Sequence, residues 1–299
     1  MFSTYKSRAN QQWINSIKKS QWEEGVEPRF TGTTQTVSEV GGEFVKLYKM
    51  IFAEKEISGE EYFLNGLKEH KLVQSSRRML DEPFTETEAA RVMENLPVAK
   101  QPGPNRIPSG LFKRMTKTFA KKFADMINES SRTGILPKHF LEGDISMLYK
   151  KADREDPRNY RPITLLNSDY KIYTRVLAHR MIKVVHAFVA ECQKGFVPDT
   201  FIAEATMLTR LIEGYINEEG EGREGIMLFL DMEKAFDRVS YDFTLRGLEA
   251  IGFGKKFRKM VGMMYDTNNA PKRRMYVNGY YSEWFTIKSG VAQGCPLSP

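Results

Sequence analysis

The sequence has little of what a disulfide-rich, zinc-binding or membrane-spanning protein needs. Only two of its 299 residues are cysteines, and neither Cys192 nor Cys295 has a cysteine or histidine partner at metal-ligand spacing. No apolar run approaches the roughly 18 residues of a membrane span, and no hydrophobic signal segment follows Met1. These absences exclude a disulfide framework and a structural zinc site. They predict a soluble, intracellular protein with no membrane partner, in the nucleus or the cytoplasm.

The residues that are present suit a globular, basic protein. Hydrophobic residues make up 41% of the chain and charged residues 28%, enough to bury one large core or two modest ones. The net charge of +7 is compatible with a polyanionic partner, because Lys and Arg neutralise phosphates. Short basic clusters such as Lys121-Lys122 and Lys272-Arg273-Arg274 are interpreted as solvated faces.

Apolar residues recur at helical spacing in four stretches, and each stretch predicts an amphipathic helix. The stretches are 44–52, 112–127, 173–188 and 202–215. A loop is predicted at Thr31–Thr36 and an exposed connection at Glu218–Gly225. At Lys100–Pro108, three prolines in seven residues forbid a helix, and Gly103 allows a sharp turn between them.

Beyond residue 225 the pattern changes from helical to mixed. Ile226–Leu230 is a short apolar run that predicts a buried strand. Ser240 is a candidate N-cap for a helix that ends just before Gly252. The stretch 272–287 alternates around Asn278-Gly279, which predicts a hairpin. Helices followed by strand, helix and hairpin indicate an α+β fold in two lobes.

Asp231 is the residue whose position suggests catalytic chemistry most directly. It follows the predicted strand 226–230, where a carboxylate can hold a hard cation. Mg²⁺ prefers one or two carboxylates together with substrate phosphates, so Asp231 suits a phosphoryl-transfer metal. From the chemistry alone, an aspartate that caps a turn after a strand is the better explanation of the position.

Two segments decide between these interpretations. Phe229–Val239 reads FLDMEKAFDRV and Gly290–Pro299 reads GVAQGCPLSP, and their order and spacing resemble two palm motifs of LINE-type reverse transcriptases, the polymerases of non-LTR retrotransposons. Asn159–Asn167 and Gln193–Pro198 resemble the fingers blocks of the same family. The turn at 100–108 resembles an element-specific motif upstream of the fingers, so that the resemblance covers about residues 85–299.

The resemblance implies a role for each matching residue. Asp231 would be a ligand of both catalytic metal ions, and Phe236 would be the aromatic gate against a ribose 2′-hydroxyl. Gln293 and Gly294 would contact the nucleotide and the template. Arg161 would grip triphosphate or template, because guanidinium binds phosphate bidentately. Lys150 and Lys151 would assist it, and Asp237 would cap the turn before the Ser240 helix rather than bind metal.

The chain departs from the family pattern at three places. Ala292 stands where the family has arginine, no arginine occurs near Thr200, and Asn105-Arg106 replaces the usual Asp-Gly. The first departure removes a cation near the nucleotide site. The remaining catalytic carboxylates of the family, an Asp-Asp pair, would follow the last residue of this sequence. The 299 residues alone are therefore expected to be inactive.

The resemblance implies a right-hand polymerase. It divides the chain into an N-terminal extension (residues 1–84), the fingers (85–224) and a partial palm (225–299). The implied activity is RNA-directed DNA synthesis with two Mg²⁺ ions, and the implied partners are an RNA template, a DNA primer and deoxynucleoside triphosphates.

Two alternatives stay open. A non-catalytic RNA-binding remnant built on the fingers would use the basic helices and leave Asp231 idle. An intron-maturase type of reverse transcriptase is disfavoured by the Lys-Ala-Phe-Asp and Cys-Pro-Leu-Ser-Pro segments.

Overall fold

The computed structural model describes residues 13–23, 26–54, 58–69, 71–218, 226–266 and 269–298. The α-helices are α2 (Val37–Ile51), α3 (Glu60–Leu67), α4 (Gln74–Asp81), α5 (Glu86–Glu94), α6 (Ser109–Arg114), α7 (Thr116–Thr133), α8 (Ser168–Ile182), α9 (Ile202–Glu218), α10 (Tyr241–Ile251) and α11 (Lys255–Gly262). The strands are β1 (Ile17–Gln21), β2 (Arg29–Thr34), β3 (Glu142–Tyr149), β4 (Tyr160–Leu166), β5 (Lys272–Val277), β6 (Tyr280–Tyr281) and β7 (Phe285–Thr286). Short 3₁₀ turns include η4 (Ala235–Arg238).

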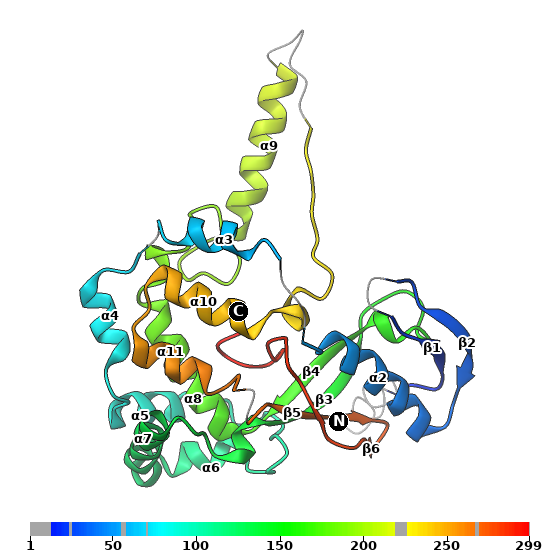
Figure 1. The fold of residues 1–299 in the computed structure, drawn as a ribbon, viewed down its shortest axis with the longest axis horizontal. Coiled ribbons are helices and arrows are strands. Elements are labelled where there is room, and N and C mark those ends of the chain that lie inside the picture. The colour runs from blue at the N-terminus through cyan, green and yellow to red at the C-terminus, as the bar shows by residue number, and fades with distance from the viewer. Residues whose placement is uncertain are drawn as a thin grey trace.

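One sheet organises the right-hand part of Figure 1, in the order β4-β3-β5-β6 with β7 also paired to β5. β3 and β5 run parallel, whereas the other pairs are antiparallel. Helix α2 covers one face of this sheet and shares a hydrophobic core with it. That core includes Phe44 and Tyr48 of α2 with Ile145 of β3 and Met275 of β5. Because side chains alternate along a strand, the opposite face carries a different set of residues.

The larger core lies in the helical lobe, on the left of Figure 1. Helices α5, α7 and α8 contribute Val92, Ile127 and Tyr173, and α10 and α11 close the lobe with Leu248 and Phe257. Among the described residues, no helix combines the length and the apolar character that crossing a membrane requires.

Several local predictions are confirmed. The helices predicted at 44–52 and 202–215 correspond to α2 and α9, and the one predicted at 173–188 corresponds to α8 as far as Ile182, beyond which Val185–Ala187 is a 3₁₀ turn. The Ser240 side chain caps α10 by accepting from the Phe243 N–H, and Gly252 ends that helix with φ 94°. Asn278 and Gly279 both have positive φ, as the predicted hairpin turn requires. The structure thus confirms the mixed α and β class.

Other local predictions need correction. Thr31–Thr34 is part of β2 rather than a loop, since it pairs with β1. The helix predicted at 112–127 is two helices, because Met115 leaves helical geometry between α6 and α7. Arg273 does not belong to a solvated face. It is 5% exposed, and its guanidinium donates to the carbonyl of Leu141.

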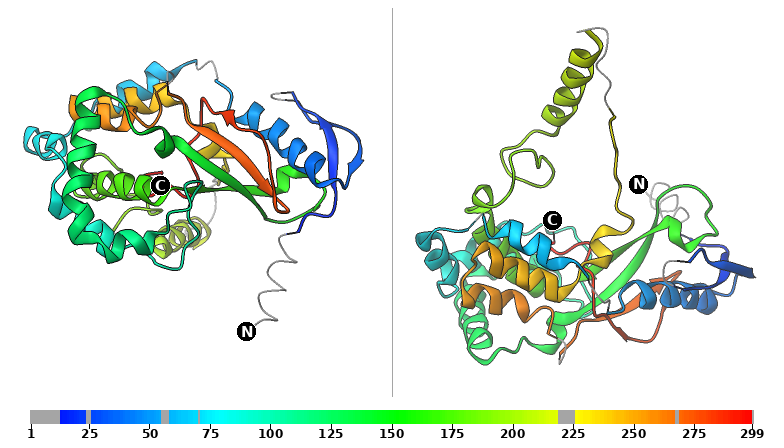
Figure 2. Two further views of the ribbon diagram at one scale, coloured as in Figure 1. Left: turned by 90° about the horizontal axis from the view of Figure 1, so that it is seen from below. Right: turned by 45° about the horizontal axis from the view of Figure 1, so that its top comes forward.

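The prediction of a buried strand at Ile226–Leu230 is wrong for this structure. The segment is extended and forms no strand, and Leu228, Phe229 and Leu230 are 75–80% exposed. An apolar run becomes a buried strand only where neighbouring strands satisfy its backbone groups, and no described strand pairs with this one. Figures 1 and 2 show the segment returning from α9, which projects from the molecule. Residues 219–225 of the predicted connection lie outside the described residues.

Candidate active site

The two palm-like segments meet directly. The Gln293 side-chain amide donates to both carboxylate oxygens of Asp237, at 2.9 and 3.1 Å. The backbone N–H groups of Gly290 and Val291 donate to the carbonyls of Val239 and Phe236, at 2.7 and 2.8 Å. Three adjacent contacts therefore fix the Gln293 segment against the turn that follows Asp231.

Strand β4 is the third part of this junction. Thr164 donates its N–H to the Gln293 carbonyl at 2.8 Å. Gly294 has φ 123°, and a Cβ atom there would lie 2.7 Å from the Thr164 carbonyl oxygen. Only glycine permits that approach. The close neighbour of Gly294 in the described structure is therefore β4 of the Asn159–Asn167 block.

Asp237 has a structural role, as predicted, but it binds Gln293 instead of capping the turn before α10. Ser240 caps α10, whereas the Asp237 carboxylate is 2% exposed and holds Gln293. Burial raises the pKa of Asp237, although the Gln293 hydrogen bond and the charges of Lys234 and Arg238 oppose the shift. A carboxylate engaged in this way orients the glutamine amide.

Sequence reasoning missed Lys234. Its backbone has φ 50°, a left-handed conformation that side chains rarely adopt. Its ammonium group lies 3.3 Å from the Tyr48 hydroxyl and 5.2 Å from the centroid of that ring. Burial lowers the pKa of Lys234, while Asp237 and Glu233 oppose the shift. Lys234 thus anchors the palm-like turn to α2, and no local pattern in the sequence indicates a partner 186 residues away.

Asp231 itself lies in the exposed, extended segment that precedes η4. The described residues contain no group of three His, Cys, Asp or Glu side chains that could hold a metal ion. Because Asp237 is occupied by Gln293, Asp231 is the aspartate of the motif that is open to a cation. A pair of hard divalent ions needs more oxygen ligands than one carboxylate. The described residues therefore do not by themselves fit a two-metal centre.

Phe236 is half-buried at the edge of the junction. Its ring is 38% exposed and meets Phe196 edge to face, with the centroids 6.4 Å apart. Phe196 belongs to the Gln193–Pro198 block, so the structure brings a fingers-like block next to the predicted gate. The exposed side of the ring is available to a small ligand.

Arg161 lies on β4, on the sheet face opposite α2. Its side chain is exposed and makes no hydrogen bond or ion pair with any described residue. Lys150 and Lys151 are exposed in the connection between β3 and β4. The three cations belong to one hairpin, but no direct contact joins Arg161 to Asp231.

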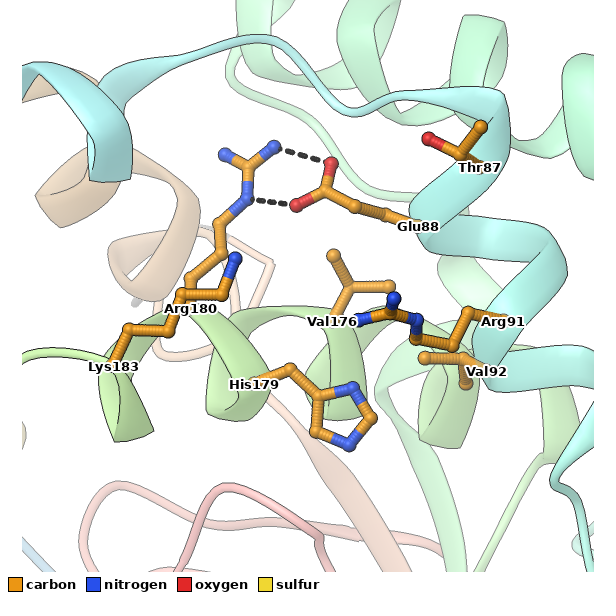
Figure 3. Close-up of a pocket in the computed structure, with 8 residues that line it drawn as sticks. All are labelled: Thr87, Glu88, Arg91, Val92, Val176, His179, Arg180 and Lys183. Atoms are coloured by element: carbon orange, nitrogen blue, oxygen red, sulfur yellow. Dashed lines mark hydrogen bonds and ion pairs between the residues drawn. The ribbon is translucent and has the colours of Figure 1, made fainter.

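The cations of helix α8 lie in two kinds of environment. Arg180 is buried and pairs with Glu88 of α5. Both line a cavity of about 240 Å³ together with His179, Lys183 and Arg91 (Figure 3). Burial lowers the pKa of His179, and the charges of Arg175, Arg91 and Lys183 lower it further. Arg180 therefore serves folding, while its neighbours form a basic surface.

Comparisons with known proteins agree with this geometry. Residues 149–299 match the family model described as reverse transcriptase (RNA-dependent DNA polymerase). The chain is 29% identical over 255 residues to the Transposon TX1 uncharacterized 149 kDa protein of Xenopus laevis, covering 84% of this chain and 19% of that protein. It is 26% identical over 261 residues to the RNA-directed DNA polymerase from mobile element jockey of Drosophila melanogaster, covering 80% and 28%.

A third relative is the Retrovirus-related Pol polyprotein from type-1 retrotransposable element R2 of Popillia japonica. It is 29% identical over 168 residues, which cover 56% of this chain and 22% of that protein. The chain spans 19–28% of the length of these curated relatives.

Proposed function

The chain belongs to the reverse transcriptase family of RNA-dependent DNA polymerases, in its non-LTR retrotransposon branch, and from this premise we propose that it supplies the fingers and the first part of the palm to an enzyme that copies RNA into DNA. Residues 85–224 would be the fingers and 225–299 the partial palm, with residues 1–84 as an extension. The partners would be an RNA template, a DNA primer and deoxynucleoside triphosphates.

The observation that carries this proposal is the junction of Asp237 with Gln293. Two segments 56 residues apart, each resembling a palm motif, are joined by two side-chain hydrogen bonds and lie beside the exposed ring of Phe236. A single motif match would be weak support. Two matches that fold against each other, with β4 beneath them, support one nucleotide site.

The side chains predicted for that site suggest how it works. Arg161 would bind phosphate, since its guanidinium is exposed and unpaired among the described residues. Phe236 would fill the space that a 2′-hydroxyl needs, while Asp237 holds the Gln293 amide in one orientation toward the nucleotide. Reverse transcriptases generally use divalent metal ions, which stabilise the charge that develops on the phosphates. Asp231 would supply one carboxylate to such ions.

The gate can be tested in a polymerase that joins this chain to a family palm and thumb. Replacing Phe236 by valine is expected to raise ribonucleotide use relative to deoxynucleotide use by at least about tenfold, because lost steric exclusion of one group is worth roughly 1–3 kcal/mol. Single-nucleotide incorporation rates for paired ribo- and deoxynucleotides measure the ratio.

Phe201→Val provides the matched control, since Phe201 is 66% exposed and lies outside the junction. It should leave the ratio unchanged. If Phe236→Val also leaves sugar discrimination unchanged, the ring is ordinary packing and the nucleotide site lies elsewhere.

The 299 residues alone are expected not to extend a primer, because Asp231 cannot by itself hold two divalent ions against a triphosphate. Primer extension on an RNA template, with Mg²⁺ or Mn²⁺, checks this expectation. Wild type and Asp231→Ala should give the same background. Incorporation by wild type above that background would show that this chain assembles a working metal site.

A further inference from the structure

The sheet face opposite α2 is apolar on its β4 side, with Leu148, Ile163 and Leu165, and polar and aromatic on its β5–β6 side. On the polar side the register places five residues next to one another: Asp144 and Ser146 on β3, Arg274 and Tyr276 on β5, and Tyr281 on β6. No described helix packs on this face with a hydrophobic core. The composition of the β5–β6 side therefore indicates a surface that contacts a polar ligand.

A stack of rings and guanidinium groups occupies the β5–β6 end of this face. The Arg274 guanidinium carbon lies 4.1 Å from the Tyr281 ring centroid and 4.6 Å from that of Trp284. Tyr276 adds a further ring, 4.7 Å from Tyr281. The Nε of Arg274 donates to Asp144 at 2.7 Å, which leaves its two terminal nitrogens without a hydrogen bond among the described residues. Arg274 is thus fixed in place, and its two terminal nitrogens can still donate hydrogen bonds to a ligand.

Arg106 joins the same stack from the turn at Lys100–Pro108. Its φ is 61°, a left-handed conformation that costs a non-glycine residue about 1 kcal/mol. The guanidinium donates to the Tyr281 hydroxyl and lies 5.5 Å from that ring. Residues with strained backbone of this kind cluster at functional sites such as ligand-binding sites. Here the strained conformation places a second cation beside Arg274.

A cavity opens next to the stack, where β3 and β5 stop pairing after Ser146 and Tyr276. Its volume is about 330 Å³, and its lining includes Trp13, which is 52% exposed, and Tyr276, together with the buried apolar residues Ile14, Met147 and Val277. The Ser146 hydroxyl and the Tyr276 hydroxyl have no hydrogen-bond partner among the described residues. The cavity therefore offers two aromatic side chains, an apolar lining and unused polar groups at a size that suits a planar ring.

We propose that this face binds a single-stranded nucleic acid, with one base in the cavity between Trp13 and Tyr276 and neighbouring phosphates on Arg106 and Arg274. Exposed aromatic rings with adjacent cations are the chemistry that holds unpaired bases and their backbone. A duplex hides its base faces and gains nothing from the cavity. The assignment to RNA rather than DNA rests on the proposed function, whereas the preference for a single strand rests on the face itself.

The test measures binding of the 299-residue chain to a fluorescent 12-nucleotide RNA of mixed sequence, to the same DNA sequence and to the RNA duplex, across salt concentrations. The single-stranded RNA should bind most tightly. Trp13→Ala should weaken its binding by roughly 5- to 100-fold, the range for losing one stacked base, and Trp13→Phe should restore most of it.

Arg106→Gly separates a binding role from a folding role. Glycine relieves the strained backbone, so the free energy of unfolding should not fall, while RNA affinity falls several-fold. The slope of log affinity against log salt should flatten by about 0.7 for each phosphate that the variant no longer neutralises. Lys256→Ala removes an exposed cation of α11 in the helical lobe, and should leave affinity within about twofold of wild type.

Equal affinity for the duplex, or RNA binding unchanged by both Trp13→Ala and Arg106→Gly, would overturn the proposal. Tighter binding of the DNA strand would overturn the assignment to RNA. Failure here is distinguishable from failure of the proposed function, because the Phe236 test measures sugar discrimination at a different site.

Discussion

Replacing Arg180 by alanine is expected to lower the free energy of unfolding by about 3–5 kcal/mol, the range for removing one partner of a buried ion pair. The Arg180 side chain is 3% exposed and binds Glu88 through two nitrogens, each at 2.7 Å. It also donates to three main-chain carbonyls, those of Leu80, Glu82 and Pro83. In the variant, all of these acceptors in the helical lobe lose their hydrogen-bond donor. Urea unfolding followed by circular dichroism measures the loss.

Arg132→Ala is the matched control. Arg132 also contacts a carboxylate through two nitrogens, that of Glu129, but its side chain is 74% exposed, and a pair at the surface contributes no more than about 1 kcal/mol. Equal losses for the two variants would contradict the importance of burial at Arg180.

Acid should reduce the difference between wild type and Arg180→Ala. Burial alone would raise the pKa of Glu88, but hydrogen bonds from Arg180 and Thr85 together with the charge of Arg180 outweigh burial and hold the pKa below its usual value. A carboxyl group with a depressed pKa stabilises the folded state above its unfolded pKa, and that contribution is lost as pH falls below about 4.5. The difference between the two proteins should therefore narrow in this range.

The sequence predicts local structure well where local chemistry decides it. Ser240 and Gly252 bound α10 because a capping hydroxyl and a left-handed glycine act within one turn. Asn278-Gly279 determines its hairpin for a similar reason. Ile226–Leu230 fails because an apolar pattern identifies a segment that can be buried without identifying the strands that would bury it. Arg273 and Arg274 differ in burial although they are adjacent, since neighbouring residues of a strand face opposite sides.

In the candidate site, too, local motifs are readable from the sequence, whereas contacts between distant segments are not. Motif resemblance selects Asp231, Phe236 and Gln293 as residues of one site, and this assignment stays a prediction. The contacts that hold the site together were not predictable, because the Asp237–Gln293 and Lys234–Tyr48 contacts join residues far apart in the chain. A glycine in the sequence can indicate such a contact, because a backbone that another segment approaches closely has no room for a Cβ atom.

Gly290 is the position where that reasoning leads to the largest expected effect on the site. Its φ is 83°, and a Cβ atom would lie 2.5 Å from the Asp237 carbonyl oxygen. Gly290→Ala must therefore separate the two palm-like segments, at a cost of roughly 2–5 kcal/mol from strained backbone and overpacking together. The hydrogen bonds of the Gly290 and Val291 amides to Val239 and Phe236 should break with it. Amide hydrogen exchange is expected to show reduced protection at Val291, and urea unfolding to show the destabilisation.

Gly279→Ala distinguishes steric separation from backbone strain alone. Gly279 has nearly the same φ, 84°, but a Cβ atom there would meet nothing within 4 Å. It should cost only about 1 kcal/mol and leave Val291 protected, because the hairpin turn lies away from the junction. In the polymerase joined to a family palm and thumb, Gly290→Ala should also weaken nucleotide binding, whereas Gly279→Ala should not. Equal effects of the two substitutions on Val291 protection would mean that contact between the palm-like segments does not depend on the close approach at Gly290, and that the Asp237–Gln293 hydrogen bonds alone hold the segments together.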